Sequence, residues 1–145
     1  MKHLIFKGKP LTGKSLFSRI IFNNEKTCWI DGRTFRKESF PFDVTYNEKW
    51  EYKNIVIDDP GKDFNLEEFY TLIFSDNLII DRKNRERIAV KTPRFIFLLD
   101  SEIIDLPEKT PSFNRRFHVV DFDKDPISEV TKIIHQEKII IKTAQ

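Results

Sequence analysis

The chain has 145 residues, the length of one compact domain, and its 25 basic and 23 acidic residues leave a formal net charge of only +2. That balance argues against a purely electrostatic coat for nucleic acid, and a composition of 39% hydrophobic and 33% charged residues argues against disorder. The single cysteine, Cys28, excludes an internal disulfide and a four-cysteine zinc site, and because no apolar run is long enough for a membrane span or a signal peptide, we expect a soluble intracellular protein.

Five short apolar runs predict β-strands. Each run is rich in Ile, Val, Leu or Phe and stops at Gly, Asp or Pro, as strands buried on both faces do. In chain order the runs lie at residues 3–7, 27–30, 55–57, 94–99 and 118–122.

Helical patterns lie between these runs. Residues 15–22 gather apolar side chains on one face, which predicts an amphipathic helix. A second helix is expected to begin at Asn65, because Asn65 and Glu68 have the spacing of a capping box. A third is expected over residues 126–136.

Two further β runs, at 78–82 and 88–90, predict a small hairpin, and residues 33–50 have no assignment. Strands that alternate with helices predict an α/β fold, in which helices cover both faces of a mostly parallel five-stranded sheet. We expect a single domain over residues 1–145, with its core at about 3–123 and a C-terminal helix and tail at 124–145.

Residues 8–15 fit the pattern G-x-x-x-x-G-K-[ST], the Walker A phosphate loop, and they connect a predicted strand to a predicted helix. Glycine at both ends lets the backbone N–H groups of the loop point inward, toward a phosphate. The lysine would reach the β- and γ-phosphates of ATP, and the serine hydroxyl would ligate Mg²⁺. The alternative, a chance match, is disfavoured by this strand–loop–helix context. The expected ATP-binding residues are Gly8, Lys9, Pro10, Leu11, Thr12, Gly13, Lys14 and Ser15.

Two adjacent carboxylates, Asp58 and Asp59, follow the apolar run at 55–57. Open α/β sheets bind ligands at the carboxyl ends of their strands, where these two side chains should lie. Asp58 is expected to hold Mg²⁺ through water, and Asp59 to accept a proton from the attacking water. The alternative is a turn, because Asp59-Pro60-Gly61 has good turn chemistry.

The stretch at 78–85 (Leu-Ile-Ile-Asp-Arg-Lys-Asn-Arg), followed by 91–96 (Lys-Thr-Pro-Arg-Phe-Ile), resembles the superfamily 3 helicases of small DNA viruses and plasmids, and most closely the papillomavirus replicative helicases. In that family a basic hairpin, I-D-R-K-x-R, precedes K-x-P and an apolar sensor strand. The resemblance covers residues 4–122, about the whole predicted core. It implies a three-layer P-loop NTPase of the AAA+ type that works in DNA replication.

The resemblance also implies site residues outside the phosphate loop. Lys83, with Asn84 and Arg85, matches the hairpin tip that tracks single-stranded DNA, and the local excess of basic residues suits phosphate binding without base specificity. The alternative is a solvated charged hairpin. Arg116, with Arg115 as its rival, matches an arginine finger inserted into the ATP site of a neighbouring subunit, and the alternative is plain surface charge. A finger of this kind implies a homo-oligomeric ring when the protein is active, and leaves room for a monomer in isolation.

Asp100 departs from the family, which has asparagine at the end of the sensor strand. An aspartate accepts a hydrogen bond from water, but it donates none to a phosphate oxygen and repels one. Three hypotheses therefore stay open. The leading one is an ATPase that couples Mg·ATP turnover to single-stranded DNA. The second is an accessory module that binds ATP and hydrolyses it slowly or not at all, and the third is a small-molecule P-loop kinase.

The histidines His3, His118 and His135 have no partner at metal-ligand spacing and are expected to be strand or surface residues.

Overall fold

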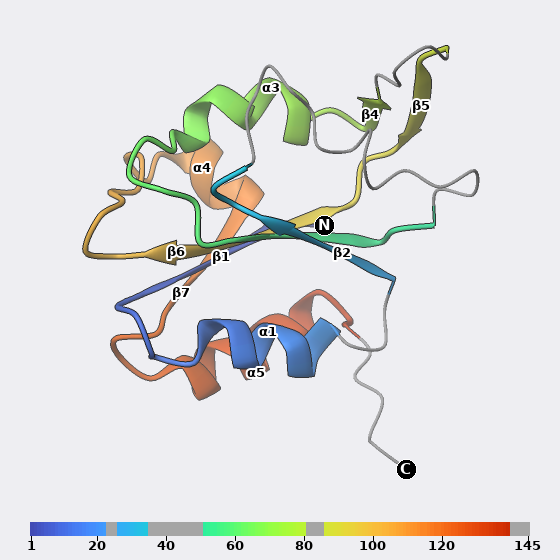
Figure 1. Cartoon of the computed structure of the whole chain (residues 1–145). Helices are drawn as coiled ribbons and strands as arrows, with labels where there is room; N and C mark the ends of the chain where they lie inside the picture. Colours follow the sequence, from blue (N-terminus) through green and yellow to red (C-terminus); the bar gives the residue numbers. More distant parts are fainter. Residues whose placement is uncertain (23–25, 35–50, 81–85, 140–145) are drawn as a thin grey trace.

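A computed structural model describes residues 1–22, 26–34, 51–80 and 86–139 of the chain (Figure 1). Its main sheet has five strands in the order β2-β3-β6-β1-β7, and all four neighbouring pairs are parallel. This confirms the predicted α/β architecture. The strands are β1 (His3–Gly8), β2 (Thr27–Asp31), β3 (Asn54–Asp58), β6 (Arg94–Asp100) and β7 (Phe117–Asp121).

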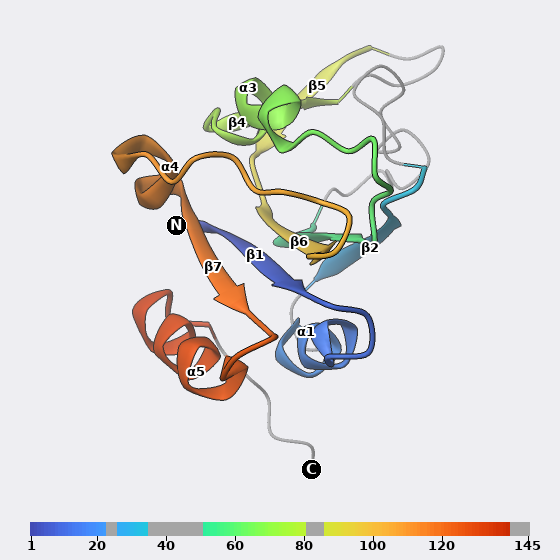
Figure 2. The same cartoon turned by 90° about the vertical axis from the view of Figure 1, so that its left-hand side faces the viewer.

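The sheet is covered by helices on both faces (Figures 1 and 2). Helices α1 (Lys14–Phe22) and α5 (Pro126–Gln136) lie on one face. The other face carries the 3-10 helix η1 (Leu66–Phe69), the short helix α3 (Tyr70–Ile73) and α4 (Pro111–Arg116). The expected helix at 126–136 has the predicted bounds, and α1 begins one residue before the expected start.

Two hydrophobic clusters form the core, one on each face of the sheet. Successive residues of a strand point to opposite faces, so Ile5 belongs to the cluster under α3, and Leu4 and Phe6 belong to the cluster under α1 and α5. All three side chains are at most 1% exposed. Burial on both faces explains why these strands appear in the sequence as continuous apolar runs.

The segment after Asn65 differs from the expected helix. Asn65 does cap it, but its side-chain oxygen accepts from the backbone N–H of Glu67 at 3.1 Å, and the first turn is a 3-10 helix that continues as α3. The expected capping box with Glu68 is therefore not formed by the asparagine side chain. Leu66 and Phe69 are both buried in this tighter turn, which indicates that packing on the sheet sets its geometry.

The predicted hairpin is present as an antiparallel pair, β4 (Asn77–Ile80) and β5 (Ile88–Lys91), separate from the main sheet. Its expected tip, Lys83, Asn84 and Arg85, lies outside the described residues. Within the described ranges, no helix combines the length and the hydrophobicity needed to span a bilayer.

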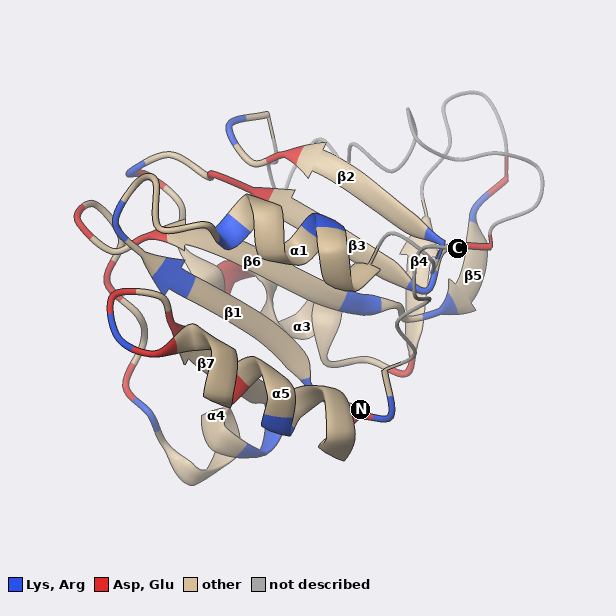
Figure 3. Cartoon of the chain, turned by 90° about the horizontal axis from the view of Figure 1, so that it is seen from below, with Lys and Arg blue, Asp and Glu red and all other residues tan. Residues whose placement is uncertain are grey.

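The strands of the main sheet differ in charge between their first and last residues (Figure 3). A basic residue stands at or just before the start of every strand, and four of the five strands end in aspartate. The basic residues are Lys2, Lys26, Lys53, Arg94 and Arg116, and the aspartates are Asp31, Asp58, Asp100 and Asp121. The strand that lacks a terminal aspartate is β1, which ends at Gly8, where the phosphate loop begins.

Candidate nucleotide-binding site

The phosphate loop connects β1 to α1 at the carboxyl edge of the sheet. Gly13 has a φ of +95°, a conformation that side-chain-bearing residues rarely adopt, so the motif glycine is needed for the curl of the loop. The Lys14 ammonium donates to the backbone oxygens of Gly8, at 2.8 Å, and of Lys9, at 2.9 Å. The lysine thus lies across the inside of the loop, with its charge at the centre.

The two carboxylates at the end of β3, Asp58 as its last residue and Asp59 as the next, lie opposite the start of α1. The Ser15 hydroxyl donates to Asp58 Oδ1 at 3.4 Å, although the two residues are 43 positions apart. Asp59 has a φ of +54°, and its backbone N–H donates to the Leu98 oxygen of β6 at 3.2 Å. Asp59 is therefore both a turn residue and a member of the site.

The strand order brings Asp100 to the same place. Strand β6 lies between β1 and β3, with Gly8 in register with Asp100 and Asp58 in register with Leu98. An open pocket of about 760 Å³ results, lined by the phosphate loop together with the strand-end carboxylates. The predicted site residues that line it are Pro10, Leu11, Thr12, Gly13, Lys14, Ser15, Asp58, Asp59 and Asp100.

Burial and the nearby carboxylates have opposite effects on the pKa of Lys14. Burial lowers the pKa of the Lys14 ammonium, and the carboxylates of Asp100 and Asp123 offset this only in part. A half-buried ammonium loses water and gains loop carbonyls, which suits it to exchange those carbonyls for the oxygens of an anion.

Arg33 is a pocket residue that the sequence analysis did not identify. It follows the end of β2, and its guanidinium nitrogen Nη2 lies 3.2 Å from Asp59 Oδ2. Both side chains are more than half exposed, so the pair is solvent-screened. The available signal was its position just after a strand that ends at the ligand-binding edge.

Asp123 is the second residue that was missed. It follows β7, and its Oδ1 accepts from the backbone N–H of Lys9 at 2.9 Å, whereas its Oδ2 accepts from the Ser101 hydroxyl at 3.0 Å. The hydrogen bond from Lys9 lowers the pKa of Asp123. One carboxylate therefore joins Lys9, the second residue of the phosphate loop, to Ser101, the residue after Asp100.

The pocket fits a magnesium ion that arrives with phosphates. Mg²⁺ prefers hard oxygen ligands and takes few of them from the protein, and Ser15 and Asp58 supply a hydroxyl and a carboxylate. Among the described residues, no group of three or more acidic, histidine or cysteine side chains could hold a metal alone. These residues therefore suit a Mg²⁺ site that phosphate oxygens complete, better than a site made of protein ligands alone.

Arg115 and Arg116 do not reach this pocket. They end α4, and the next residue, Phe117, pairs with His3 at the start of β1. The length of β1 separates that edge from Gly8 by about 17 Å. Both arginines line a different pocket, at the amino edge of the sheet.

The fold is similar to that of several solved structures with which the chain shares little sequence identity. The apo structure of the NrS-1 C-terminal region matches with a TM-score of 0.59 and 20% identity over 93% of this chain, and a second structure of that region matches with 0.51 and 18% over 95%. The JCV helicase, solved with a bound small molecule, matches with a TM-score of 0.53 and 14% identity over 95% of this chain. At 14–20% identity, these matches show a likeness of fold and agree with the predicted α/β architecture.

The chain spans 34% of the length of the NrS-1 structures and 41% of the JCV helicase chain. No protein-family model matches the sequence, and no curated protein matches it in sequence.

Proposed function

We propose that this chain is the ATPase domain of a superfamily 3-like DNA helicase, which binds Mg·ATP in the carboxyl-edge pocket, hydrolyses it and couples turnover to single-stranded DNA. One observation carries the proposal: Lys14 and Ser15 of the phosphate loop face Asp58 and Asp59 in one pocket. A cation, a hydroxyl and two carboxylates in this arrangement are the groups that phosphoryl transfer to water requires.

Each side chain has a distinct role in this proposal. Lys14 would exchange the loop carbonyls for oxygens of the β- and γ-phosphates, and the loop N–H groups would hold the same phosphates. Ser15 and Asp58 would hold Mg²⁺, which would neutralise charge on the phosphates. Asp59 would orient the attacking water and accept its proton.

The partners follow from the resemblance and from the layout of the chain. Single-stranded DNA would bind the basic hairpin around Lys83, and Arg116 or Arg115 would enter the pocket of a second copy. The opposite placement of the arginines and the phosphate loop supports action between copies, because neither arginine is near the pocket of its own chain. A homo-oligomeric ring is the assembly that such contacts would build.

Steady-state ATP hydrolysis at low salt, with and without single-stranded DNA, tests the proposal. We expect turnover that rises with DNA, is abolished by Lys14→Ala and is strongly reduced by Asp59→Asn. Turnover that is unchanged in Lys14→Ala would place the activity elsewhere. Turnover without any DNA response would separate the ATPase from the helicase role.

A second candidate, an ATP-binding accessory module with slow hydrolysis or none, is favoured by two features of the pocket. Arg33 pairs with the carboxylate that would activate water, and Asp100 adds negative charge where the γ-phosphate would lie. Tight Mg·ATP binding without measurable turnover, also in the presence of DNA, would favour this candidate over the first.

A further inference from the structure

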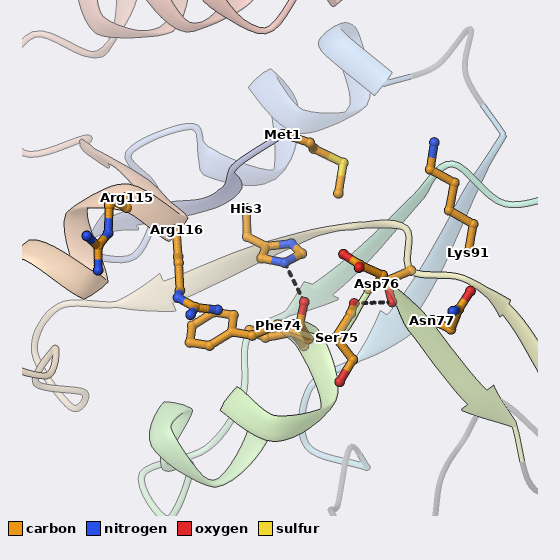
Figure 4. A pocket seen from close by; sticks show the side chains of 11 residues that line it. Met1, His3, Phe74, Ser75, Asp76, Asn77, Lys91, Arg115 and Arg116 are labelled. Atoms are coloured by element: carbon orange, nitrogen blue, oxygen red, sulfur yellow. Dashed lines mark hydrogen bonds between the residues drawn. The ribbon is translucent and has the colours of Figure 1, made fainter.

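Arg115 and Arg116 are neighbours in the sequence, but they lie differently at the amino-edge pocket (Figure 4). The Arg116 guanidinium carbon lies 4.2 Å from the centre of the Phe74 ring, which is cation–π geometry. The Arg115 side chain points away from that ring. Both side chains are exposed, and neither forms an ion pair with a described residue.

The Phe74 ring is itself held in place by other rings. It stacks on Tyr70 with 4.6 Å between ring centres, and it meets Phe117 edge-to-face at 5.5 Å. Phe117 is 3% exposed and pairs with β1 in the sheet. The ring under Arg116 is thus a fixed part of the core surface.

The backbone around Phe74 is fixed as well, by hydrogen bonds on both sides. The buried His3 ring donates from Nε2 to the Ile73 oxygen at 2.8 Å and accepts at Nδ1 from the backbone N–H of Phe95 at 2.9 Å. Thr92, which follows β5, donates its hydroxyl to the Ser75 oxygen at 2.6 Å. The turn that presents Phe74 therefore also joins the base of the β4–β5 hairpin to the sheet.

We infer that Phe74 is a positioning residue that holds Arg116, and not Arg115, extended for contact with the triphosphate bound by a second copy of the chain. This rests on the proposed function. A free arginine side chain loses conformational freedom when it binds a phosphate, and a ring that already orients the guanidinium reduces this loss. An exposed cation–π contact corresponds to roughly a two- to fivefold effect on the step that uses the arginine.

A double-mutant cycle on kcat tests whether Phe74 acts through Arg116. Phe74→Leu keeps an apolar side chain and removes the ring, and Phe74→Tyr keeps the ring. We expect Phe74→Leu to lower kcat about two- to fivefold without changing the affinity for Mg·ADP. Phe74→Tyr should retain the wild-type kcat. In an Arg116→Ala background, Phe74→Leu should have no further effect on kcat. Arg115→Ala is the matched control, and in that background Phe74→Leu should keep its full effect.

Equal losses of kcat from Phe74→Leu with and without Arg116 would overturn the inference, because the ring would then have only a structural role. An Arg116→Ala variant with wild-type turnover would instead refute the finger role in the proposed function. The placement of Arg116 has a separate test by NMR, which requires no turnover. The Arg116 side-chain protons should show an upfield ring-current shift that Phe74→Leu removes and Phe74→Tyr keeps, and protons that do not move in Phe74→Leu would contradict the inference.

Discussion

The Asp59 carboxylate lies 3.2 Å from the Arg33 guanidinium, at the mouth of the pocket that contains Lys14. Asp59 follows β3 and Arg33 follows β2, and the two strands are neighbours in the sheet. The pair places a second cation beside the expected position of the γ-phosphate. It offsets one of the three carboxylates of the pocket, Asp58, Asp59 and Asp100.

Replacement of Arg33 by alanine should therefore weaken ATP binding more than ADP binding, because the γ-phosphate, which ADP lacks, is the group expected to lie beside Arg33. We expect about a fivefold loss for Mg·ATP and less than about a twofold loss for Mg·ADP at low salt, since the exposed pair is screened by solvent. Arg33→Lys should retain most of the affinity. Titration with both nucleotides checks this, and equal losses for the two would contradict it.

Removal of the Asp123 carboxylate should loosen the phosphate loop. In Asp123→Ala the Lys9 N–H and the Ser101 hydroxyl both lose their acceptor, so we expect Mg·ADP and Mg·ATP to bind about three- to tenfold more weakly, by similar factors. Ser101→Ala breaks only the link to the end of β6, and it should have a smaller effect on affinity. Isothermal titration of the two variants tests the difference, and unchanged affinity in Asp123→Ala would refute this role.

Gly32, which directly follows β2, should be essential for the placement of Asp58 and Asp59. A Cβ on Gly32 would lie 2.4 Å from the Pro60 nitrogen and 2.8 Å from the Asp58 oxygen, so Gly32→Ala must push the end of β3 away. We expect about 2 kcal/mol of destabilisation and weaker nucleotide binding. Gly61→Ala is the matched control because, in the part of the chain that the structure describes, no non-neighbouring residue has an atom within 4 Å of its Cβ position. Urea unfolding and nucleotide titration of both variants check this, and equal behaviour of the two would contradict it.

The buried His3 should make stability depend on pH. Burial lowers the pKa of His3 to about 4 in the folded chain, from 6.5. As the pH falls below 6.5 the unfolded chain binds a proton first, so this contribution to stability is complete above 6.5 and declines down to about pH 4. The decline is expected to amount to about 3 kcal/mol.

Urea unfolding at several pH values compares the wild type with His3→Gln, which should show a flatter profile over this range. His135→Gln replaces an exposed histidine and should keep the wild-type profile. Parallel profiles for the wild type and His3→Gln would rule out the assignment.

The central strands β1, β3 and β6 could be predicted from the sequence because they are buried on both faces and therefore have continuous apolar runs, as residues 94–99 do in β6. The order of the strands could not, since nothing local in the sequence indicates that β6 lies between β1 and β3. The 3-10 geometry of the turn after Asn65 could not be predicted from the local sequence either, because it depends on how Leu66 and Phe69 pack against the sheet.

The same distinction holds for the site. The phosphate loop is one contiguous segment of the sequence, and the Asp58–Asp59 pair is another. Each has a local pattern that is sufficient to place it at the carboxyl ends of the strands. Arg33 and Asp123 act on partners that are 26 and 114 positions away, so only the fold brings each pair together. Their positions just after strand ends were the sole signal available.

The most direct measurement of the central claim is a titration of the chain with Mg·ATP, comparing Lys14→Ala with Lys9→Ala. Both variants remove one positive charge from the same loop, so long-range electrostatics are matched. The account predicts that Lys9→Ala binds nearly as the wild type does, because Lys9 acts through its backbone, and that Lys14→Ala loses at least about tenfold in affinity. Equal affinities in the two variants would contradict the assignment of a nucleotide site to this loop.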